Sequence, residues 1–208
     1  MATLDVWGVV HPERSALADE LSALSEQQWS TPSLCSGWTV RDVVAHMAAT
    51  ASITPLSFFP TLIGSGFKFE RVQAKGIAEQ KGADAADTLA HFRAIVTSTK
   101  RPPGPKDTIL GETILHCEDV RRPLGLAHSY APNAVVEVAD FYKGSNLILG
   151  TKRRIEGLSL RATDSSWSHG SGPEVTGPML SLLLAMTGRK AALDELSGEG
   201  LDTLRARD

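Results

Sequence analysis

Apolar residues recur at helical spacing through most of the first 150 positions of the chain. Leu17, Leu21, Leu24 and Trp29 predict a first helix that begins at about Pro12, because proline suits the first helical position. A second helix is predicted to begin after Thr39, with Asp42 completing its N-terminal cap. Further helices are predicted over residues 83–98, 108–120 and 133–149, and a short helix and loop over 52–69.

The pattern changes towards the end of the chain. Residues 157–163 alternate between apolar and polar side chains, which predicts a strand, and residues 167–172 predict a second one. A helix is predicted from Pro178 to about Thr187, and an amphipathic stretch ends near Arg205. The sequence therefore predicts a mainly α protein, with a helical bundle over residues 1–153 followed by a small α+β unit over residues 154–208.

Composition narrows the class of protein. The 208 residues are 42% hydrophobic and carry a net charge of −3, and their basic clusters are too short to follow a phosphate backbone, so no nucleic-acid partner is expected. Two cysteines do not make a disulfide framework. No signal peptide is visible, and no apolar run reaches the roughly 20 residues that a membrane span needs. We therefore expect a cytoplasmic protein without a membrane partner.

Candidate metal chemistry rests on three residues. Glu112 and His116 stand four apart on a predicted helix, which places their Cβ atoms roughly 6 Å apart on one face. His46 lies on a separate predicted helix. If the two helices pack together, two imidazoles and a carboxylate can converge on a metal and leave coordination positions open, as in a catalytic site. Each feature by itself is common on helices that bind nothing.

Two longer segments favour the metal-site interpretation over a pair of ordinary helices. SLCSGWTVRDVVAH at 33–46 and HCEDVRRPLG at 116–125 resemble the two signatures of the mycothiol-dependent maleylpyruvate isomerase family, within the DinB-like group of metal-binding four-helix bundles. The resemblance extends through 102–105, resumes at 164–167 and 187–189, and so covers most of the chain. It implies that His46, Glu112 and His116 are the metal ligands.

The resemblance also implies a reaction. A divalent metal, with zinc preferred and nickel, iron or manganese as alternatives, would hold the sulfur of mycothiol as a thiolate that attacks an electrophilic small molecule. Isomerase or thiol S-transferase activity would follow. A non-catalytic metal-binding or regulatory bundle and a metal-assisted hydrolase stay open as alternatives. A homodimer is compatible with the sequence, which names no interface.

The surrounding residues are open to two interpretations each. Arg189 matches a basic residue near the family's active site, or it is a solvated arginine that closes a helix. Asp119 either accepts a hydrogen bond from a ligand histidine or pairs with Arg122. Arg189 and Asp119 are accordingly the candidate catalytic residues. Cys35 is expected to serve packing, although its loop could bring it to the mouth of the site, and Cys117 is expected to be a small buried side chain.

Overall fold

The computed structural model describes residues 4–147 and 149–207. By their internal contacts, residues 1–129 and 130–208 form two compact units. This division falls earlier in the chain than the boundary expected after residue 153, and the domain limits 1–153 and 154–208 stay a prediction. No helix among the described residues is both long enough and apolar enough to cross a membrane.

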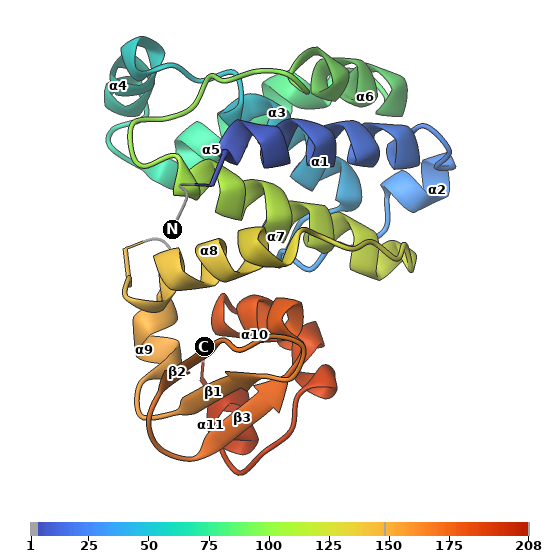
Figure 1. Cartoon of the computed structure of the whole chain (residues 1–208). Coiled ribbons are helices and arrows are strands. Elements are labelled where there is room, and N and C mark those ends of the chain that lie inside the picture. Colours follow the sequence, from blue (N-terminus) through green and yellow to red (C-terminus); the bar gives the residue numbers. More distant parts are fainter. Residues whose placement is uncertain (1–3, 148, 208) are drawn as a thin grey trace. The chain divides into compact units, whose positions relative to one another are not determined.

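The N-terminal unit is built from helices alone (Figure 1). Its helices are α1 (Val6–Leu21), α2 (Glu26–Trp29), α3 (Val40–Thr50), α4 (Pro55–Gly64), α5 (Phe69–Lys81), α6 (Ala85–Ala94) and α7 (Asp107–Leu124). Helices α1, α3, α6 and α7 form a four-helix bundle in which α7 and α6 each pack against both α1 and α3. Fully buried side chains such as Leu17, Val44, Phe92 and Ile114 fill its core.

The first helix differs from the prediction at both ends. Helix α1 begins at Val6, and Pro12 lies inside it, because the buried Val6 and Val10 hold the turn before the proline against the bundle. The helix ends at Leu21 instead of continuing to Trp29. Ser25 then forms a capping box with Gln28 and starts the separate helix α2.

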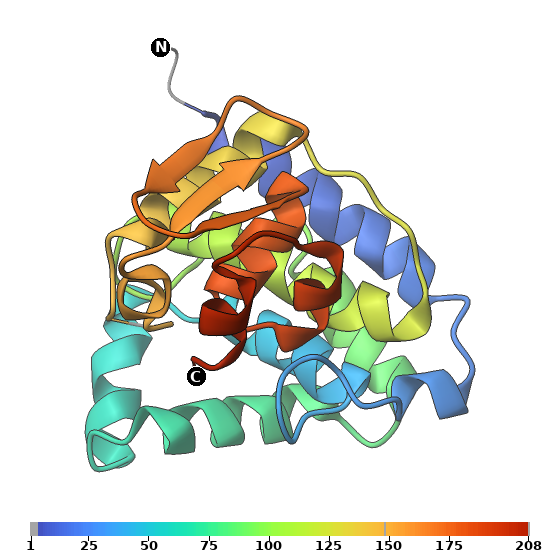
Figure 2. The same cartoon turned by 90° about the horizontal axis from the view of Figure 1, so that it is seen from below.

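Helix α5 was not predicted at all. None of its residues is buried, so it carries no apolar periodicity that a sequence pattern could reveal. It packs against α3, where Gly76 lets the two backbones approach closely, since a Cβ at this position would lie 3.0 Å from the Cβ of Ala49. Helix α4 confirms the short helix expected in the 52–69 segment. Figure 2 shows α4 and α5, in teal, meeting at a corner of the N-terminal unit.

The C-terminal unit combines helices with a small sheet. Its elements are α8 (Pro132–Lys143), α9 (Thr151–Ile155), β1 (Ser159–Ala162), β2 (Ser168–Gly170), β3 (Glu174–Gly177), α10 (Met179–Met186), a 3-10 helix (Lys190–Glu195) and α11 (Leu201–Arg205). Strand β1 lies in the middle of the sheet, antiparallel to β2 and parallel to β3. Leu160, Val175 and Leu182 are fully buried in its core.

The expected fold class is confirmed, as a mainly helical chain with a bundle first and a small α+β part last. Both predicted strands are present, whereas β3 was not predicted. Helix α8 ends at Lys143, earlier than the predicted residue 149. The helix expected from Pro178 is α10, and Pro178 caps its N-terminus.

Candidate functional site

His46 and His116 meet in the core of the N-terminal bundle. His46 lies on α3 and His116 on α7, and these two helices pack against each other. The two imidazole rings are 5.0 Å apart between centroids, with their planes at 83°. Both side chains are half-buried. The sequence placed the two histidines on separate helices, and the packing of α3 on α7 is what brings them together.

Asp119 sets the orientation of His116. Its carboxylate is fully buried one turn further along α7, and His116 Nδ1 lies 2.9 Å from Asp119 Oδ2. When Nδ1 carries the proton and donates it to this oxygen, Nε2 is left with its lone pair for a metal. The first of the two interpretations of Asp119 is therefore the one observed. Arg122, the alternative partner, instead pairs with Glu118 at 2.8 Å.

Cys35 lies at the site, which is the less favoured of the two places that the sequence left open for it. Its thiol donates to Asp119 Oδ2 over 3.1 Å, and its sulfur lies 3.8 Å from His116 Nδ1. It is half-buried and contributes to the polar cluster around His116, in addition to filling space in the loop. The sequence feature that could have indicated this position is that Cys35 lies in the 33–46 segment, which resembles the family signature. Cys117, in contrast, is fully buried as expected.

Glu112 adds a carboxylate one turn before His116. Burial of this carboxyl group raises its pKa to about 7, although interactions with His116 and Arg14 and a hydrogen bond with Thr50 act in the opposite direction. Arg14 is itself buried and donates to the backbone oxygens of Ile95 and Ser98. A bound cation would favour the ionised form of the Glu112 carboxyl group.

The imidazole of His46 is kept neutral. Its burial, followed by the effect of His116, lowers its pKa to about 3, against a smaller opposing effect of Asp119. A neutral imidazole is the form that binds a metal. The Trp38 ring covers His46 from the other side, with 5.1 Å between the ring centroids.

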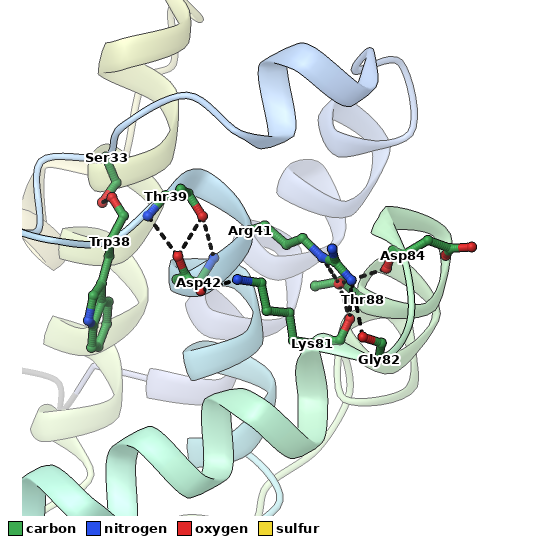
Figure 3. A network of polar contacts seen from close by, with 9 residues as sticks. All are labelled: Ser33, Trp38, Thr39, Arg41, Asp42, Lys81, Gly82, Asp84 and Thr88. Carbon is green, nitrogen blue, oxygen red and sulfur yellow. Dashed lines mark hydrogen bonds and ion pairs between the residues drawn. The ribbon is translucent and has the colours of Figure 1, made fainter.

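The N-terminus of α3 is anchored by a polar network (Figure 3). Thr39 and Asp42 form the predicted capping box, in which each backbone N–H donates to the other side chain, at 2.9 and 3.2 Å. Lys81, at the end of α5, pairs with the same Asp42 carboxylate at 2.6 Å. These contacts fix where α3 begins, and so fix the position of His46 two turns later.

A second part of the same network ties α3 to the α5–α6 connection (Figure 3). Arg41 Nε donates to Thr88 Oγ1 at 2.9 Å, and Arg41 Nη2 donates to the backbone oxygens of Lys81 at 2.9 Å and Gly82 at 3.2 Å. On the opposite side, Ser33 Oγ donates to the Trp38 carbonyl at 2.9 Å. The loop that carries Trp38 is therefore held together with the helix that carries His46.

A cavity of about 470 Å³ in the N-terminal unit reaches His46. Helices α3, α4 and α5 form its walls, and polar side chains such as Thr50, Ser57 and Thr61 line it together with Phe69. A small molecule in this cavity would lie next to an imidazole that can hold a metal. Helix α4 contributes Ser57 and Thr61 to this wall.

Two sets of metal-donor atoms share His116. Cys35, His116 and Asp119 offer atoms within 4.8 Å of one another, but their separations of 2.9 and 3.1 Å around Asp119 Oδ2 are those of hydrogen bonds. We therefore regard this trio as the group that orients His116. His116 Nε2, His46 and the Glu112 carboxylate stay the predicted ligand set, since two imidazoles and a carboxylate suit a divalent cation.

Arg189 lies in the other unit. It directly precedes the 3-10 helix, is 8% exposed, and donates to the Thr187 backbone oxygen at 3.2 Å. The alternative of a solvated arginine is therefore wrong, because its side chain is buried within the C-terminal unit. A catalytic role for Arg189 stays a prediction.

The four-helix bundle and its histidine and carboxylate donors define the class as a DinB-like helical protein with a candidate metal centre. Comparison with protein-family models matches residues 10–105 to the mycothiol maleylpyruvate isomerase N-terminal domain. This match supports the mycothiol-dependent maleylpyruvate isomerase family, whose signatures the sequence resembles. No curated protein sequence matches the chain significantly.

Two solved structures share the fold over nearly the whole chain. One is a crystal structure of the mycothiol-dependent maleylpyruvate isomerase, with a TM-score of 0.64 and 17% identity over 96% of both chains. The other is a histidine-to-alanine mutant of that enzyme, with a TM-score of 0.60 and 16% identity over 96% of both chains. At this level of identity the likeness establishes the fold.

Proposed function

We propose that the chain is a divalent-metal-dependent and mycothiol-dependent isomerase or thiol S-transferase that acts on an electrophilic small molecule. The observation that carries this proposal is the meeting of His46 on α3 with His116 on α7, where His46 lines a cavity and the Glu112 carboxyl group stands one turn before His116. The match of residues 10–105 to the family supports mycothiol as the thiol. Because thiols stay reduced there, we place the reaction in the cytoplasm.

Each ligand has a role that follows from its surroundings. Burial keeps His46 neutral, so its lone pair is available near neutral pH. Asp119 accepts the Nδ1 proton of His116 and presents the other nitrogen. Glu112 supplies the negative charge, which a buried cation would neutralise. Two imidazoles and one carboxylate suit zinc, and also nickel, iron or manganese.

Three protein ligands leave room for a cosubstrate. When bound, a divalent cation would stabilise the thiolate form of a thiol whose free pKa is about 8.5. The cavity next to His46 would hold the electrophile within reach of this sulfur. Isomerisation results if the thiol adduct rotates about its former double bond and expels the thiol, and transfer results if the adduct persists. Asp119 and Arg189 are the proposed further contributors to activity.

Metal content is the first test. Elemental analysis of the purified parent is expected to give about one metal per chain after incubation with zinc, whereas Glu112→Ala and His116→Ala lose the metal and keep their helical circular dichroism. Glu137→Ala removes an exposed glutamate of α8 and serves as the matched control. A parent that stays metal-free with zinc, nickel, iron and manganese would contradict the proposal.

Thiol dependence is the second test. Turnover of maleylpyruvate or another electrophilic olefin by the metal-loaded parent should require added mycothiol. Turnover that proceeds equally without any thiol would indicate a metal-assisted hydrolase instead. A metal-loaded protein without turnover of any electrophile would indicate a non-catalytic metal-binding bundle.

A further inference from the structure

Exposed apolar side chains gather on one short stretch of the N-terminal unit. This 56–69 patch consists of Leu56, Phe59, Ile63, Phe67 and Phe69, which are 90%, 57%, 61%, 70% and 65% exposed. Of the large apolar side chains that are exposed among the described residues, Leu147 alone lies elsewhere. Scattered exposed apolar residues are ordinary, whereas a contiguous group marks an interaction surface.

Helix α4 turns this apolar side away from the cavity. Leu56, Phe59 and Ile63 follow the spacing i, i+3, i+7 and therefore share one face, while Ser57 and Thr61 line the cavity. No residue from 56 to 64 is buried, and none in α5 is buried. The less exposed side of α4 carries Phe58 and Leu62, which are half-buried, and the Leu56, Phe59 and Ile63 face has no covering partner among the described residues of the N-terminal unit.

Phe67, which follows α4, has an unusual backbone conformation. Phe67 has φ of 59°, a left-handed conformation that costs a non-glycine residue free energy. Its N–H donates to the Leu62 backbone oxygen at 2.9 Å, which holds this conformation in place. In this conformation the Phe67 side chain is 70% exposed, so it adds to the apolar surface that begins on α4.

The exposed apolar area of the patch can be compared with the area that a stable dimer interface buries. A large apolar side chain offers about 200 Å² when fully exposed, so the exposed fractions of Leu56, Phe59, Ile63 and Phe67 correspond to roughly 550 Å², and Phe69 faces the cavity in part. This lies near the upper end of the roughly 300–600 Å² that is typical of the largest patch on a monomer. Two such patches facing each other would bury about 1,100 Å², above the roughly 1,000 Å² that a biological interface needs.

The charges next to the patch favour a protein partner that carries both signs. Lys68, Glu70 and Arg71 are all exposed where α5 begins. A twofold-symmetric pair places the same surface on both sides, so that Glu70 of each copy can lie near a basic residue of the other. An anionic lipid surface would attract Lys68 and Arg71 but repel Glu70.

We propose that the 56–69 patch is the interface of a symmetric homodimer, in which α4 packs against α4 of a second copy. The sequence alone named no such interface, because Leu56, Phe59 and Ile63 are equally consistent with a helix buried in its own chain. Pairing through α4 would also fix one wall of the cavity that reaches His46. The proposal rests on exposure, backbone geometry and charge, and does not depend on the metal or the thiol.

The molar mass in solution tests the proposal. By light scattering after size exclusion at micromolar concentration, the parent is expected to be a dimer and Ile63→Glu a monomer with unchanged circular dichroism. Leu147→Glu is the matched control, because Leu147 is as exposed but lies outside the patch, and it should stay dimeric. A monomeric parent, a dimeric Ile63→Glu protein or a monomeric Leu147→Glu protein would overturn the assignment.

Crosslinking then tests the symmetry. Phe59→Cys and Ile63→Cys, each oxidised with copper–phenanthroline, are expected to give disulfide-linked dimers, whereas Leu147→Cys should not. A dimer that crosslinks at neither position would place the interface elsewhere and overturn the proposal. Cosedimentation of a monomeric parent with phosphatidylserine vesicles would identify lipid as the occupant of the patch and would also overturn it.

Discussion

Replacement of Glu112 by glutamine separates two effects of the carboxyl group: its burial lowers the stability of the metal-free protein, and its charge is expected to bind the metal. Without metal, the parent carries a buried carboxyl group whose pKa is raised to about 7 by burial. Glutamine has nearly the same shape, can keep the hydrogen bond from Thr50, and never ionises. We therefore expect Glu112→Gln to make the metal-free protein more stable at alkaline pH and to abolish metal binding.

The sign and size follow from proton linkage. Because the pKa of Glu112 is higher in the folded protein than its ordinary 4.5, its stabilising contribution is complete below about pH 4.5 and is lost as the pH rises through about 7. The total loss is about 3 kcal/mol. His46 acts in the opposite direction, because its lowered pKa makes its contribution present above pH 6.5 and lost as the pH falls through about 3. Both proteins contain His46, so the difference between them isolates Glu112.

The assay is urea unfolding of both proteins in the presence of a chelator. Between pH 5 and pH 8 the advantage of Glu112→Gln in unfolding free energy should grow by about 2–3 kcal/mol. Glu137→Gln, an exposed glutamate, should show no such growth. With saturating zinc the order should reverse, since a metal that binds only the folded parent stabilises it. A difference that stays constant with pH would refute the reasoning about the buried carboxyl group.

Three further variants test other parts of the structure. Asp119→Asn should weaken zinc binding about 10–100-fold in a chelator competition, and unchanged affinity would exclude an orienting role for this carboxylate. Arg121→Met should lower the unfolding free energy in urea by about 3–5 kcal/mol, because the carboxylates of Glu13 and Glu20 lose their buried partner, and a neutral effect would contradict this. Leu182→Ala should cost about 2–5 kcal/mol by the same assay, and a loss below 1 kcal/mol would show that the C-terminal core rearranges around the cavity.

Some features could be predicted without a structure, because they depend on residues that are close together in the sequence. The capping box of Thr39 and Asp42 depends only on residues three apart, and it placed the start of the helix that carries His46. The same holds for the spacing of Glu112 and His116 on α7. The two longer motifs indicated the family resemblance, because the segments around His46 and His116 match the family signatures at many positions.

Other features of the structure have no recognisable pattern in the local sequence. Helix α5 has no buried residue and therefore no apolar period, so it was missed although it forms a wall of the cavity. Packing was favoured for Cys35 over a place at the site, because the sequence of the loop before α3 does not show that it folds back onto Asp119 of α7. The outward direction of Leu56, Phe59 and Ile63 was equally hidden.

The sequence by itself thus determined which helices form where capping and periodicity are strong, and it supplied the predicted metal ligands and the family resemblance. The tertiary structure decided that His46 faces His116, that Asp119 forms a hydrogen bond with His116, and that α4 exposes apolar side chains. Side chains three or four residues apart interact through geometry that the helix itself imposes. Contacts between helices depend on how the whole bundle packs, and no local pattern encodes them.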